Sequence, residues 1–469
     1  MVFSSMVFAA LFLPLVFVLY FASKSPKIRN SILLVFSLVF YAWGEPKWIF
    51  VMLLTVTVNY FCGLLIDSTQ NHARRTLFMV IGVALSLIFL FYFKYFGFFS
   101  DIVMALLGKE NPFIRPVLPI GISFYTFQVL TYTVDVYRRK VAVQKNYAQL
   151  LMYVCFFPQL IAGPIVNYTD IAPSLAVRTI KTSDVYEGFM RFFIGFAKKV
   201  LLANTCGIIT DKLLAAETLS FAGSWLMAVA YAFQIYFDFS GYSDMAIGMG
   251  RIFGFRFFEN FNYPYISKSI TEFWRRWHIS LGTFFRDYVY IPLGGNRVPK
   301  WKNIRNIMVV WLLTGFWHGA SWNFLVWGLY YGLLLLAEKF LFRRIKEKLP
   351  AVINLAVTLV LVLIGWVFFY YENLSDGLQH LGIMFGITNA AWTDPAAIYY
   401  FKHYFLFLAA AAFACVPWKQ LTGKLPAGIS APLGGIGSRL KPVVVSILFL
   451  ASLAMIITQS YNPFLYFRF

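Results

Sequence analysis

The stretch NIMVVWLLTGFWHGASWNFLVWGLYYGLLLLAEKF, residues 306–340, shows what kind of protein this chain encodes. It carries only two charged residues, both near its end. A run of about 20 mostly apolar residues can cross the hydrocarbon core of a bilayer, so this stretch is long enough for two crossings. Polar Thr314, His318 and Asn323 interrupt its middle, where polar groups must be paired or solvated.

Apolar runs recur along the whole chain. Its 469 residues are 60% hydrophobic and 13% charged, which is roughly half of the charged fraction of about 25% that soluble domains carry. We predict an all-α polytopic membrane protein with about 11 crossings, because most of these runs suffice for one crossing. The runs outside residues 306–340 are 2–22, 31–43, 47–66, 76–99, 117–134, 148–166, 185–203, 223–240, 351–371, 398–416 and 442–458.

The basic residues indicate one orientation in the membrane. The net charge is +20, but the Lys and Arg residues stand in short stretches between apolar runs, as the positive-inside rule requires of cytoplasmic loops. Lys24, Lys27 and Arg29 follow the first run, and Arg74 and Arg75 follow the third. We therefore expect an outside N-terminus, a retained first span rather than a signal peptide, and no nucleic-acid partner.

The sequence offers little support for several other classes of chemistry. Cys62, Cys155, Cys206 and Cys415 lie far apart beside apolar residues, without a CxxC pair or a Cys/His cluster. They predict small buried side chains rather than disulfides or a metal site. The sequence has no GxSxG elbow, Walker loop, GxGxxG turn or HExxH pair, so serine or zinc hydrolysis and nucleotide-driven pumping are not indicated. No repeat or linker divides the chain, and we expect one domain over residues 1–469.

Residues 241–306 break the pattern of spanning runs. Between residues 250 and 305, ten Lys and Arg residues stand against three Asp and Glu residues, interleaved with many aromatic residues. This mixture is typical of helices that lie at the membrane interface or enter the membrane part-way. Irregular backbone at membrane depth must be buried in protein or line a solvated cavity. We therefore expect a central interfacial or re-entrant segment with an internal chamber.

His318, in the sequence TGFWHGASWN, is the first candidate for chemistry. A neutral imidazole at that depth can accept a proton through one ring nitrogen while a partner holds the other. Gly315 and Gly319 remove side-chain bulk on either side, so we expect a substrate to approach the ring. Trp317 and Asn323 are candidate substrate-binding residues. The alternative is a histidine that hydrogen-bonds two helices together.

A second cluster, FWRRWHIS, lies in the irregular segment. Its histidine, His278, stands 40 residues before His318. Arg275 and Arg276 are candidates to bind the phosphate or carboxylate groups of a donor, and Trp274 is a candidate wall of a tunnel. The alternative is an interfacial helix whose arginines meet lipid phosphates and whose tryptophans anchor it, and we favour it for the two arginines.

Two carboxylates in the sequence YFDFSGYSD form a third cluster at the end of an apolar run. Asp238 and Asp244 could form a proton relay, because ionisable groups in such runs often mark proton pathways. We favour a structural role instead. In that role they cap a helix or pair with the nearby Arg251 and Arg256.

Three long blocks resemble the signature sequences of the membrane-bound O-acyltransferases. The resemblance is strongest to the branch that holds the alginate O-acetyltransferase membrane subunit and its bacterial relatives. Several long blocks in the right order make it specific. The long blocks are FDFSGYSDMAIG (237–248), ENFNYPYISKSITEFWRRWHISLGTFFRDYVYIPLGGNR (259–297) and GFWHGASWNFLVWG (315–328). The supporting blocks are MVFSS at the start, LPIGISFYTFQ (118–128), FFPQLIAGPI (156–165) and NPFLYFRF (462–469).

The resemblance implies a ring of transmembrane helices around a thin, partly re-entrant centre with a through-tunnel. The family's catalytic histidine corresponds to His318, and a second histidine near the donor tunnel corresponds to His278. It also implies a multi-pass protein of the bacterial inner membrane that holds no bound cofactor or metal. The implied donor is a cytoplasmic thioester, either acetyl-CoA or an acylated carrier protein.

By the same resemblance, the chain would transfer an acetyl group across the membrane to an extracytoplasmic acceptor. The ultimate acceptor would be an exopolysaccharide such as alginate, reached through a separate extracytoplasmic serine acetyltransferase. His318 would be the general base, with His278, Asn323 or a backbone amide as the oxyanion donor. The alternatives are D-alanyl-type transfer to a cell-wall polymer, a transporter or flippase of polysaccharide precursors, and a non-catalytic scaffold.

Overall fold

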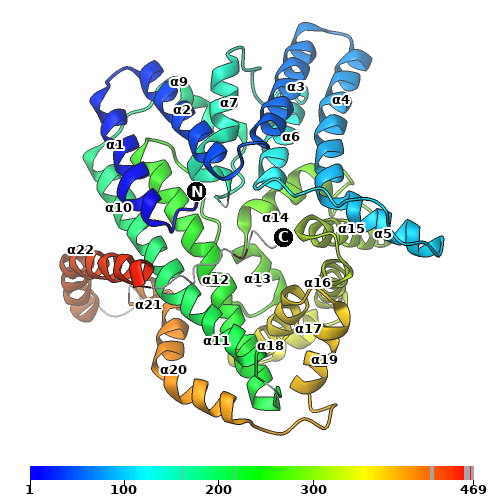
Figure 1. Ribbon diagram of the computed structural model, residues 1–469, viewed down its shortest axis with the longest axis vertical. Coiled ribbons are helices and arrows are strands. Elements are labelled where there is room, and N and C mark those ends of the chain that lie inside the picture. The colour runs from blue at the N-terminus through cyan, green and yellow to red at the C-terminus, as the bar shows by residue number, and fades with distance from the viewer. Residues whose placement is uncertain (162, 217, 423–426, 459–464, 466–469) are drawn as a thin grey trace. The chain divides into compact units, whose positions relative to one another are not determined.

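The computed structural model describes the chain apart from residues 162, 217, 423–426, 459–464 and 466–469 (Figure 1). The regular secondary structure of this described part is helical, without a strand. The prediction of an all-α protein is therefore confirmed. The chain divides into two compact units, residues 1–192 with 242–258, and residues 193–241 with 259–469.

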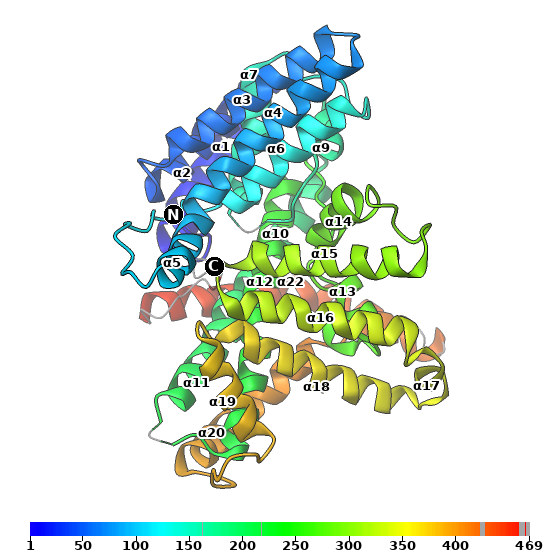
Figure 2. The same ribbon diagram turned by 90° about the vertical axis from the view of Figure 1, so that its right-hand side faces the viewer.

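The first unit contains a bundle of helices joined by buried polar side chains. Helices α3, α4 and α6 run side by side (Figure 2). The Nδ2 atom of Asn59 on α3 donates to Ser86 on α4 at 2.7 Å, and Thr133 on α6 donates to the Oδ1 atom of Asn59 at 2.6 Å. Because no water is available inside a bilayer, these mutual hydrogen bonds remove the cost of burying the three groups.

The elements of the first unit are η1 (Val7–Phe12), α1 (Leu13–Ala22), α2 (Pro26–Gly44), α3 (Ile49–Ser68), α4 (His72–Leu90), η2 (Phe91–Tyr95), α5 (Phe96–Leu106), α6 (Ile122–Tyr137), α7 (Tyr147–Cys155), α8 (Phe157–Leu160), α9 (Tyr168–Ala176) and α10 (Thr182–Ala197), the last of which ends in the second unit. Short π-helical turns, η1 and η2, extend α1 and α4.

The elements of the second unit are η3 (Lys198–Ala203), α11 (Asn204–Leu214), α12 (Phe221–Ile252), η4 (Pro264–Ile266), α13 (Ile270–Arg276), α14 (Ile279–Phe285), η5 (Arg286–Tyr290), α15 (Lys300–His318), α16 (Trp322–Phe340), α17 (Arg343–Lys348), α18 (Ala351–Tyr370), α19 (Leu374–Met384), α20 (Pro395–Ala414), α21 (Trp418–Thr422) and α22 (Ala427–Thr458). The last residues of α12, from Tyr242 onward, belong to the first unit.

Two glycines allow α15 and α16 to pack closely. A Cβ atom on Gly315 would lie 2.2 Å from the carbonyl oxygen of Phe324, and one on Gly328 would lie 2.4 Å from that of Trp311. Helices in membranes associate through such small residues, because lipid is as apolar as their side chains. Helix α18 packs against α16, so the three helices form one stack (Figure 2).

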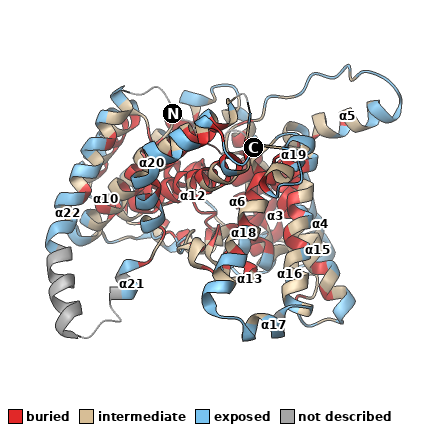
Figure 3. Ribbon diagram, turned by 90° about the horizontal axis from the view of Figure 1, so that it is seen from below, coloured by how far each residue is buried: buried red, intermediate tan, exposed pale blue. Residues whose placement is uncertain are grey.

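Helix α12 continues beyond the position where the irregular segment was expected to start. It has 32 residues and ends at Ile252, so the expected break at residue 241 is wrong. Gly241 lies inside this helix because it meets another helix: an added Cβ atom would be 2.7 Å from the carbonyl oxygen of Gly195. Most of α12 is buried (Figure 3). Residues 253–299 hold only short helical elements, and their place at the membrane interface stays a prediction.

Six helical segments in the described part of the chain are long and apolar enough to cross a membrane, which confirms a membrane protein with several apolar helices. The number of about 11 crossings stays a prediction. The run 306–340 holds two helices as predicted, whereas the run 148–166 holds only α7 and α8, with nine and four residues. The four cysteines are buried and free, as predicted. The six segments are Ile49–Ser68, His72–Leu106, Thr182–Leu214, Ala351–Tyr370, Pro395–Ala414 and Arg439–Thr458.

We predict opposite effects for two Gly→Ala substitutions within helices. Gly328→Ala should lower the free energy of unfolding by about 1–3 kcal/mol, because the new methyl group forces α15 and α16 apart. Gly282→Ala on α14 is the control, since its added Cβ atom meets nothing within 4 Å. It should be neutral or gain about 0.5–1 kcal/mol from lower backbone entropy in the unfolded chain. Thermal unfolding in detergent measures both variants, and equal stability of the two would contradict the packing role.

Candidate active site

His278 occupies a sharp turn between α13 and α14. Ser269 caps the start of helix α13, because its hydroxyl oxygen accepts from the backbone N–H of Glu272 at 3.0 Å. The helix ends at Arg276, and His278 then adopts a left-handed conformation with φ of 45°. This region is unfavourable for residues other than glycine, and such strain is concentrated at functional sites. The imidazole is buried, with 2% of the residue surface exposed.

Asn260 stabilises this turn through hydrogen bonds and determines which ring nitrogen of His278 carries the proton. Its Oδ1 atom accepts from the backbone N–H and the hydroxyl of Ser280 at 3.1 and 3.0 Å, and lies 3.3 Å from His278 Nδ1. An amide oxygen only accepts, so the hydrogen-bond network assigns the imidazole proton to Nδ1. Burial lowers the pKa of His278 to about 3. The Nε2 atom of this neutral ring therefore carries a lone pair and is an acceptor.

His318 is the last residue of α15 and has aromatic neighbours from two further helices. Its ring centre lies 5.1 Å from that of Trp327 on α16 and 5.0 Å from that of Phe369 on α18, both in edge-on geometry. The helix ends here because Gly319 is extended, with φ of −170°. The stack of α15, α16 and α18 thus positions the imidazole, which is 6% exposed.

The structure brings the two predicted histidines to the same indole ring. The ring centre of Trp317 lies 6.0 Å from that of His278 and 4.9 Å from that of His318. His278 also contacts Phe239 of α12 edge-on at 4.7 Å. Residues separated by 40 positions therefore share one aromatic enclosure. Trp317, predicted as a substrate-binding residue, lies at its centre.

Several polar atoms around the histidines are buried without a hydrogen-bond partner among the described residues. Buried polar groups are nearly always paired in native proteins, and each exception calls for an explanation. The ring centres of Trp274 and Trp327 lie 5.4 Å apart, and both rings contact that of Tyr331, so these three residues form a cluster. A polar ligand or water would satisfy them. The atoms are Trp274 Nε1, His278 Nε2, Ser321 Oγ, Asn323 Oδ1, Trp327 Nε1 and Tyr331 Oη.

The glycines that flank His318 do not open a path to its ring. The space beside Gly315 is filled by the backbone of α16, and a Cβ atom on Gly319 would lie 2.2 Å from the ring of Phe324. The expectation that they admit a substrate is therefore wrong. Both positions require glycine because neighbouring protein atoms occupy the space that a larger side chain would need.

The other predicted binding residues lie in different surroundings. Asn323 is buried, and its Nδ2 atom donates to the carbonyl oxygen of Tyr371. Arg275 is exposed. Arg276 pairs with Glu272 at 2.9 Å and donates to the carbonyl oxygen of Asn262 at 3.1 Å. The binding of a donor or of lipid phosphates by the two arginines stays a prediction. Among the described residues, His, Cys, Asp and Glu side chains form no group of three or more that could hold a metal ion.

The two carboxylates of the third cluster have structural partners, as favoured, but not the arginines that were expected. Asp238 lies 2.9 Å from Lys199 Nζ, and their side chains are 3% and 1% exposed. Lys199 also donates to Asn204 at 2.8 Å. Asp244 pairs with Arg191 at 2.8 Å. The expected Arg251 pairs instead with Asp184.

Sequence reasoning missed three residues that shape this region. Lys199 stands inside the apolar run 185–203, and an ionisable residue in such a run is a recognisable signal of a buried partner. Asn260 and Trp327 carry no such signal, because their roles arise from contacts with residues that are distant in sequence. The block NPFLYFRF (462–469) lies outside the described residues except for Leu465, whose backbone N–H donates to Asp238 at 2.9 Å.

The fold is that of a helical membrane protein. Its site holds two buried histidines among aromatic side chains, and several polar atoms around them lack a hydrogen-bond partner among the described residues. MBOAT, the membrane-bound O-acyltransferase family, matches residues 39–372. The chain belongs to this family and is an O-acyltransferase.

Three relatives show the range of acceptors named in the family. A probable alginate O-acetylase of Azotobacter vinelandii is 40% identical, and the alignment covers 100% of both chains. A peptidoglycan O-acetyltransferase of Helicobacter pylori is 34% identical over 83% of this chain and 81% of its own. A teichoic acid D-alanyltransferase of Bacillus subtilis is 31% identical over 51% of this chain and 66% of its own.

We predict that Asn260 stabilises the His278 turn. Asn260→Leu should lower the free energy of unfolding by about 1–3 kcal/mol, because the buried imidazole N–H of His278 and the half-buried backbone N–H of Ser280 lose their acceptor. Asn262→Leu is the control, since Asn262 is exposed. Thermal unfolding in detergent compares the two variants. An Asn260→Leu variant as stable as Asn262→Leu would show that the turn does not need this amide.

We also predict that Lys199 and Asp238 depend on each other. Lys199→Met should lower the free energy of unfolding by about 3–5 kcal/mol, because it leaves a buried carboxylate without its counter-charge. The double variant Lys199→Met with Asp238→Leu should recover most of this loss. Lys198→Met, at a half-buried neighbouring position, should cost less. Additive losses in the double variant, measured by unfolding in detergent, would contradict the pairing.

Proposed function

We propose that this chain transfers an acetyl group from a cytoplasmic thioester, acetyl-CoA or an acylated carrier protein, to an extracytoplasmic acceptor. The ultimate acceptor is an exopolysaccharide such as alginate. The relative named as a probable alginate O-acetylase supports this choice, since it aligns over the full length of both chains. The family relatives named for peptidoglycan and teichoic acid leave a cell-wall polymer as the alternative acceptor.

One observation carries the proposed site: His318 is buried beside a cluster of unpartnered polar atoms that includes Trp274, Trp327 and Tyr331. A structural histidine needs only partners from the protein. Here the surrounding donors and acceptors are themselves unsatisfied, so the enclosure is suited to a polar reactant. Its aromatic walls exclude bulk water, which would otherwise hydrolyse the thioester.

In the proposed reaction, His318 is the general base. A hydroxyl is a weak nucleophile near neutral pH, so a base must take its proton as it attacks. The acceptor O–H bond breaks, its proton passes to the imidazole, and the oxygen bonds to the thioester carbonyl carbon. The C–S bond then breaks, and the imidazolium returns the proton to the thiolate. The acetyl group moves to the acceptor while the carrier stays on the cytoplasmic side.

The oxyanion that forms during the attack needs a hydrogen-bond donor. His278 does not suit this role, because its only imidazole proton faces Asn260 and its Nε2 atom accepts. The indole N–H of Trp327 can only donate and is buried without a partner in the described part of the chain. We therefore assign the oxyanion contact to Trp327, Asn323 or a backbone amide. His278 Nε2 positions an N–H or O–H group of a substrate.

The remaining parts of the proposal follow from family membership. The chain forms a ring of about 11 transmembrane helices around a tunnel, and it resides in the bacterial inner membrane. A separate extracytoplasmic serine acetyltransferase receives the acetyl group and passes it to the polysaccharide. From the residues themselves we propose that Trp274 lines the tunnel and that Arg275 and Arg276 meet lipid phosphates, with binding of the donor as the alternative. No metal or bound cofactor takes part.

We predict that His318→Ala lowers the rate of acetyl transfer about 10²–10⁴-fold, because general base catalysis contributes a factor of this size to the rate. Purified protein in inside-out vesicles receives a labelled acetyl thioester on the cytoplasmic side. The label that reaches an acceptor on the opposite side is measured, with the extracytoplasmic partner supplied. His403→Ala is the control, since His403 is an exposed histidine of α20.

Near-wild-type turnover of the His318→Ala variant would rule out its role as base. A substrate-dependent transport signal that survives the substitution would favour a transporter. Loss of transfer in both His318→Ala and His403→Ala would indicate a general loss of folding. The thermal unfolding of each purified variant is therefore measured beside its activity.

A further inference from the structure

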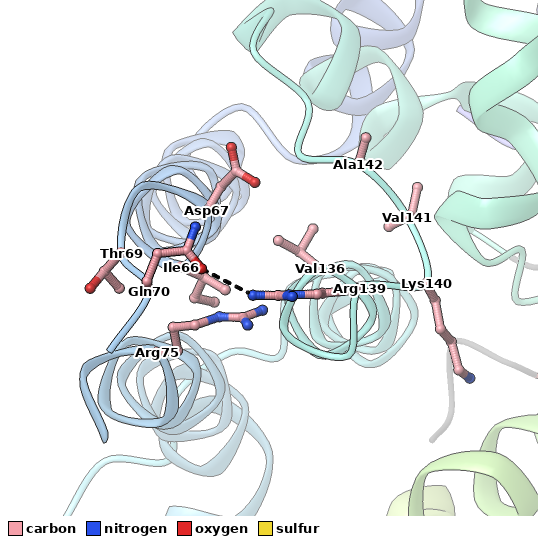
Figure 4. Close-up of a pocket in the computed structure, with 10 residues that line it drawn as sticks. All are labelled: Ile66, Asp67, Thr69, Gln70, Arg75, Val136, Arg139, Lys140, Val141 and Ala142. Carbon is pink, nitrogen blue, oxygen red and sulfur yellow. Dashed lines mark hydrogen bonds between the residues drawn. The ribbon is translucent and has the colours of Figure 1, made fainter. Parts of the chain in front are cut away.

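A polar pocket lies in the first unit, away from the residues of the candidate active site in sequence. It has a volume of about 430 Å³ and forms where α3 ends, α4 begins and α6 ends (Figure 4). Three of its lining residues are basic, Arg75, Arg139 and Lys140, and one is acidic, Asp67. The pocket is therefore positively charged and large enough for a phosphate group with part of the molecule that carries it.

Two guanidinium groups converge in this pocket. Figure 4 shows the side chains of Arg75 and Arg139 extending into the same space, while Lys140 points away from them. Their hydrogen-bond acceptors in the described part of the chain are neutral: Arg75 donates to the carbonyl oxygen of Tyr137 at 2.8 Å, and Arg139 donates to Gln70 Oε1 at 3.3 Å. Arg75 Nε is buried without an acceptor there. Two like charges held together without a carboxylate partner favour a bound anion.

Arg139 adopts a backbone conformation that favours glycine. Arg139 has φ of 56° and ends α6 in a left-handed conformation. The N–H of Lys140 donates to the carbonyl oxygen of Asp135 at 2.9 Å, and that of Arg139 donates to Val136 at 3.1 Å. This pattern is a Schellman motif, in which the left-handed position is usually glycine because other residues are strained there. Arg139 adopts this strained conformation, and its guanidinium group lies in the pocket.

The pocket lies at a chain connection that the sequence predicts to be at the cytoplasmic surface of the membrane. It lies at the connection between two candidate spans, Ile49–Ser68 and His72–Leu106. Arg74 and Arg75 in this connection, and Arg138 to Lys140 after α6, are basic residues that the positive-inside rule assigns to the cytoplasmic side. The cytoplasmic leaflet carries anionic lipids that attract such residues.

We propose that this pocket is a binding site for a phosphate group on the cytoplasmic side of the membrane, with Arg75 and Arg139 as its ligands. Guanidinium groups match the geometry of phosphate oxygens with paired N–H donors. The phosphate belongs either to the headgroup of an anionic phospholipid or to a soluble cytoplasmic molecule. The site is independent of His318 and of the proposed transfer reaction.

The test measures binding to the purified full-length chain in detergent, through ligand-dependent thermal stabilisation and native mass spectrometry. Phosphatidylglycerol is compared with phosphatidylcholine, and inorganic phosphate with chloride at equal ionic strength. The variants are Arg75→Gln and Arg139→Gly, with Arg74→Gln as the control. Arg74 is exposed and does not line the pocket, so its replacement removes the same charge from the neighbouring position. Arg139→Gly also relieves the left-handed strain, so it should remain folded.

We expect the apparent affinity for the bound probe to fall about tenfold in Arg75→Gln and in Arg139→Gly, because each loses a charge-assisted hydrogen bond. Arg74→Gln should keep wild-type affinity. A loss seen only with phosphatidylglycerol identifies a lipid headgroup, and a loss seen with inorganic phosphate identifies a soluble ligand. Unchanged binding in both pocket variants, an equal loss in Arg74→Gln, or no binding of either probe to the wild-type chain would overturn the proposal.

Discussion

The close contact between α15 and α16 is the constraint on which the candidate site depends. At Gly315 and Gly328 the helices approach until no side-chain atom fits between them. Lipid does not drive helices together as water does, so close van der Waals packing must hold the pair. The contact places the end of α15 beside the aromatic side chains of α16. His318, the last residue of α15, thereby meets Trp327 instead of lipid.

The enclosure around the two histidines differs from two other buried polar groups of the chain, the Asn59 cluster and the Lys199–Asp238 pair, in its hydrogen bonding. Asn59 joins Ser86 and Thr133 through mutual hydrogen bonds, and the Lys199–Asp238 pair neutralises itself. These groups are complete within the protein and stabilise its packing. The indole and hydroxyl groups near His318 lack partners among the described residues. An unsatisfied buried group is costly, so each one calls for a partner, and at this place a reactant is the partner that we propose.

The same distinction separates the arginines of the chain. Arg191, Arg251 and Arg276 each face a carboxylate, so their charges are balanced by the fold. Arg75 and Arg139 share a pocket with neutral acceptors. Sequence position does not reveal the acceptor of each arginine, because the carboxylates that face Arg191 and Arg251 are more than 50 residues away in the chain.

Local composition explains what the sequence determined by itself. Long uncharged runs predicted the all-α membrane class and the room for two helices in residues 306–340, because helix formation in lipid depends on the apolar length of each run. The interleaved basic and aromatic residues predicted an irregular segment over residues 241–306, of which the first 12 residues are in fact helical. The motif sequences indicated His318 and His278 and the acyltransferase family. These predictions needed no knowledge of which residues meet.

Only the tertiary structure decided what each of these residues contacts. Gly315, Gly319 and Gly241 looked like openings or breaks, yet each is small because another helix or ring fills its space. Asp238 forms an ion pair with Lys199 rather than with the arginines that follow it in sequence. The physical reason is that a buried group is satisfied by whatever folding brings within about 3 Å. That neighbour comes from distant parts of the chain, which periodicity and spacing do not encode.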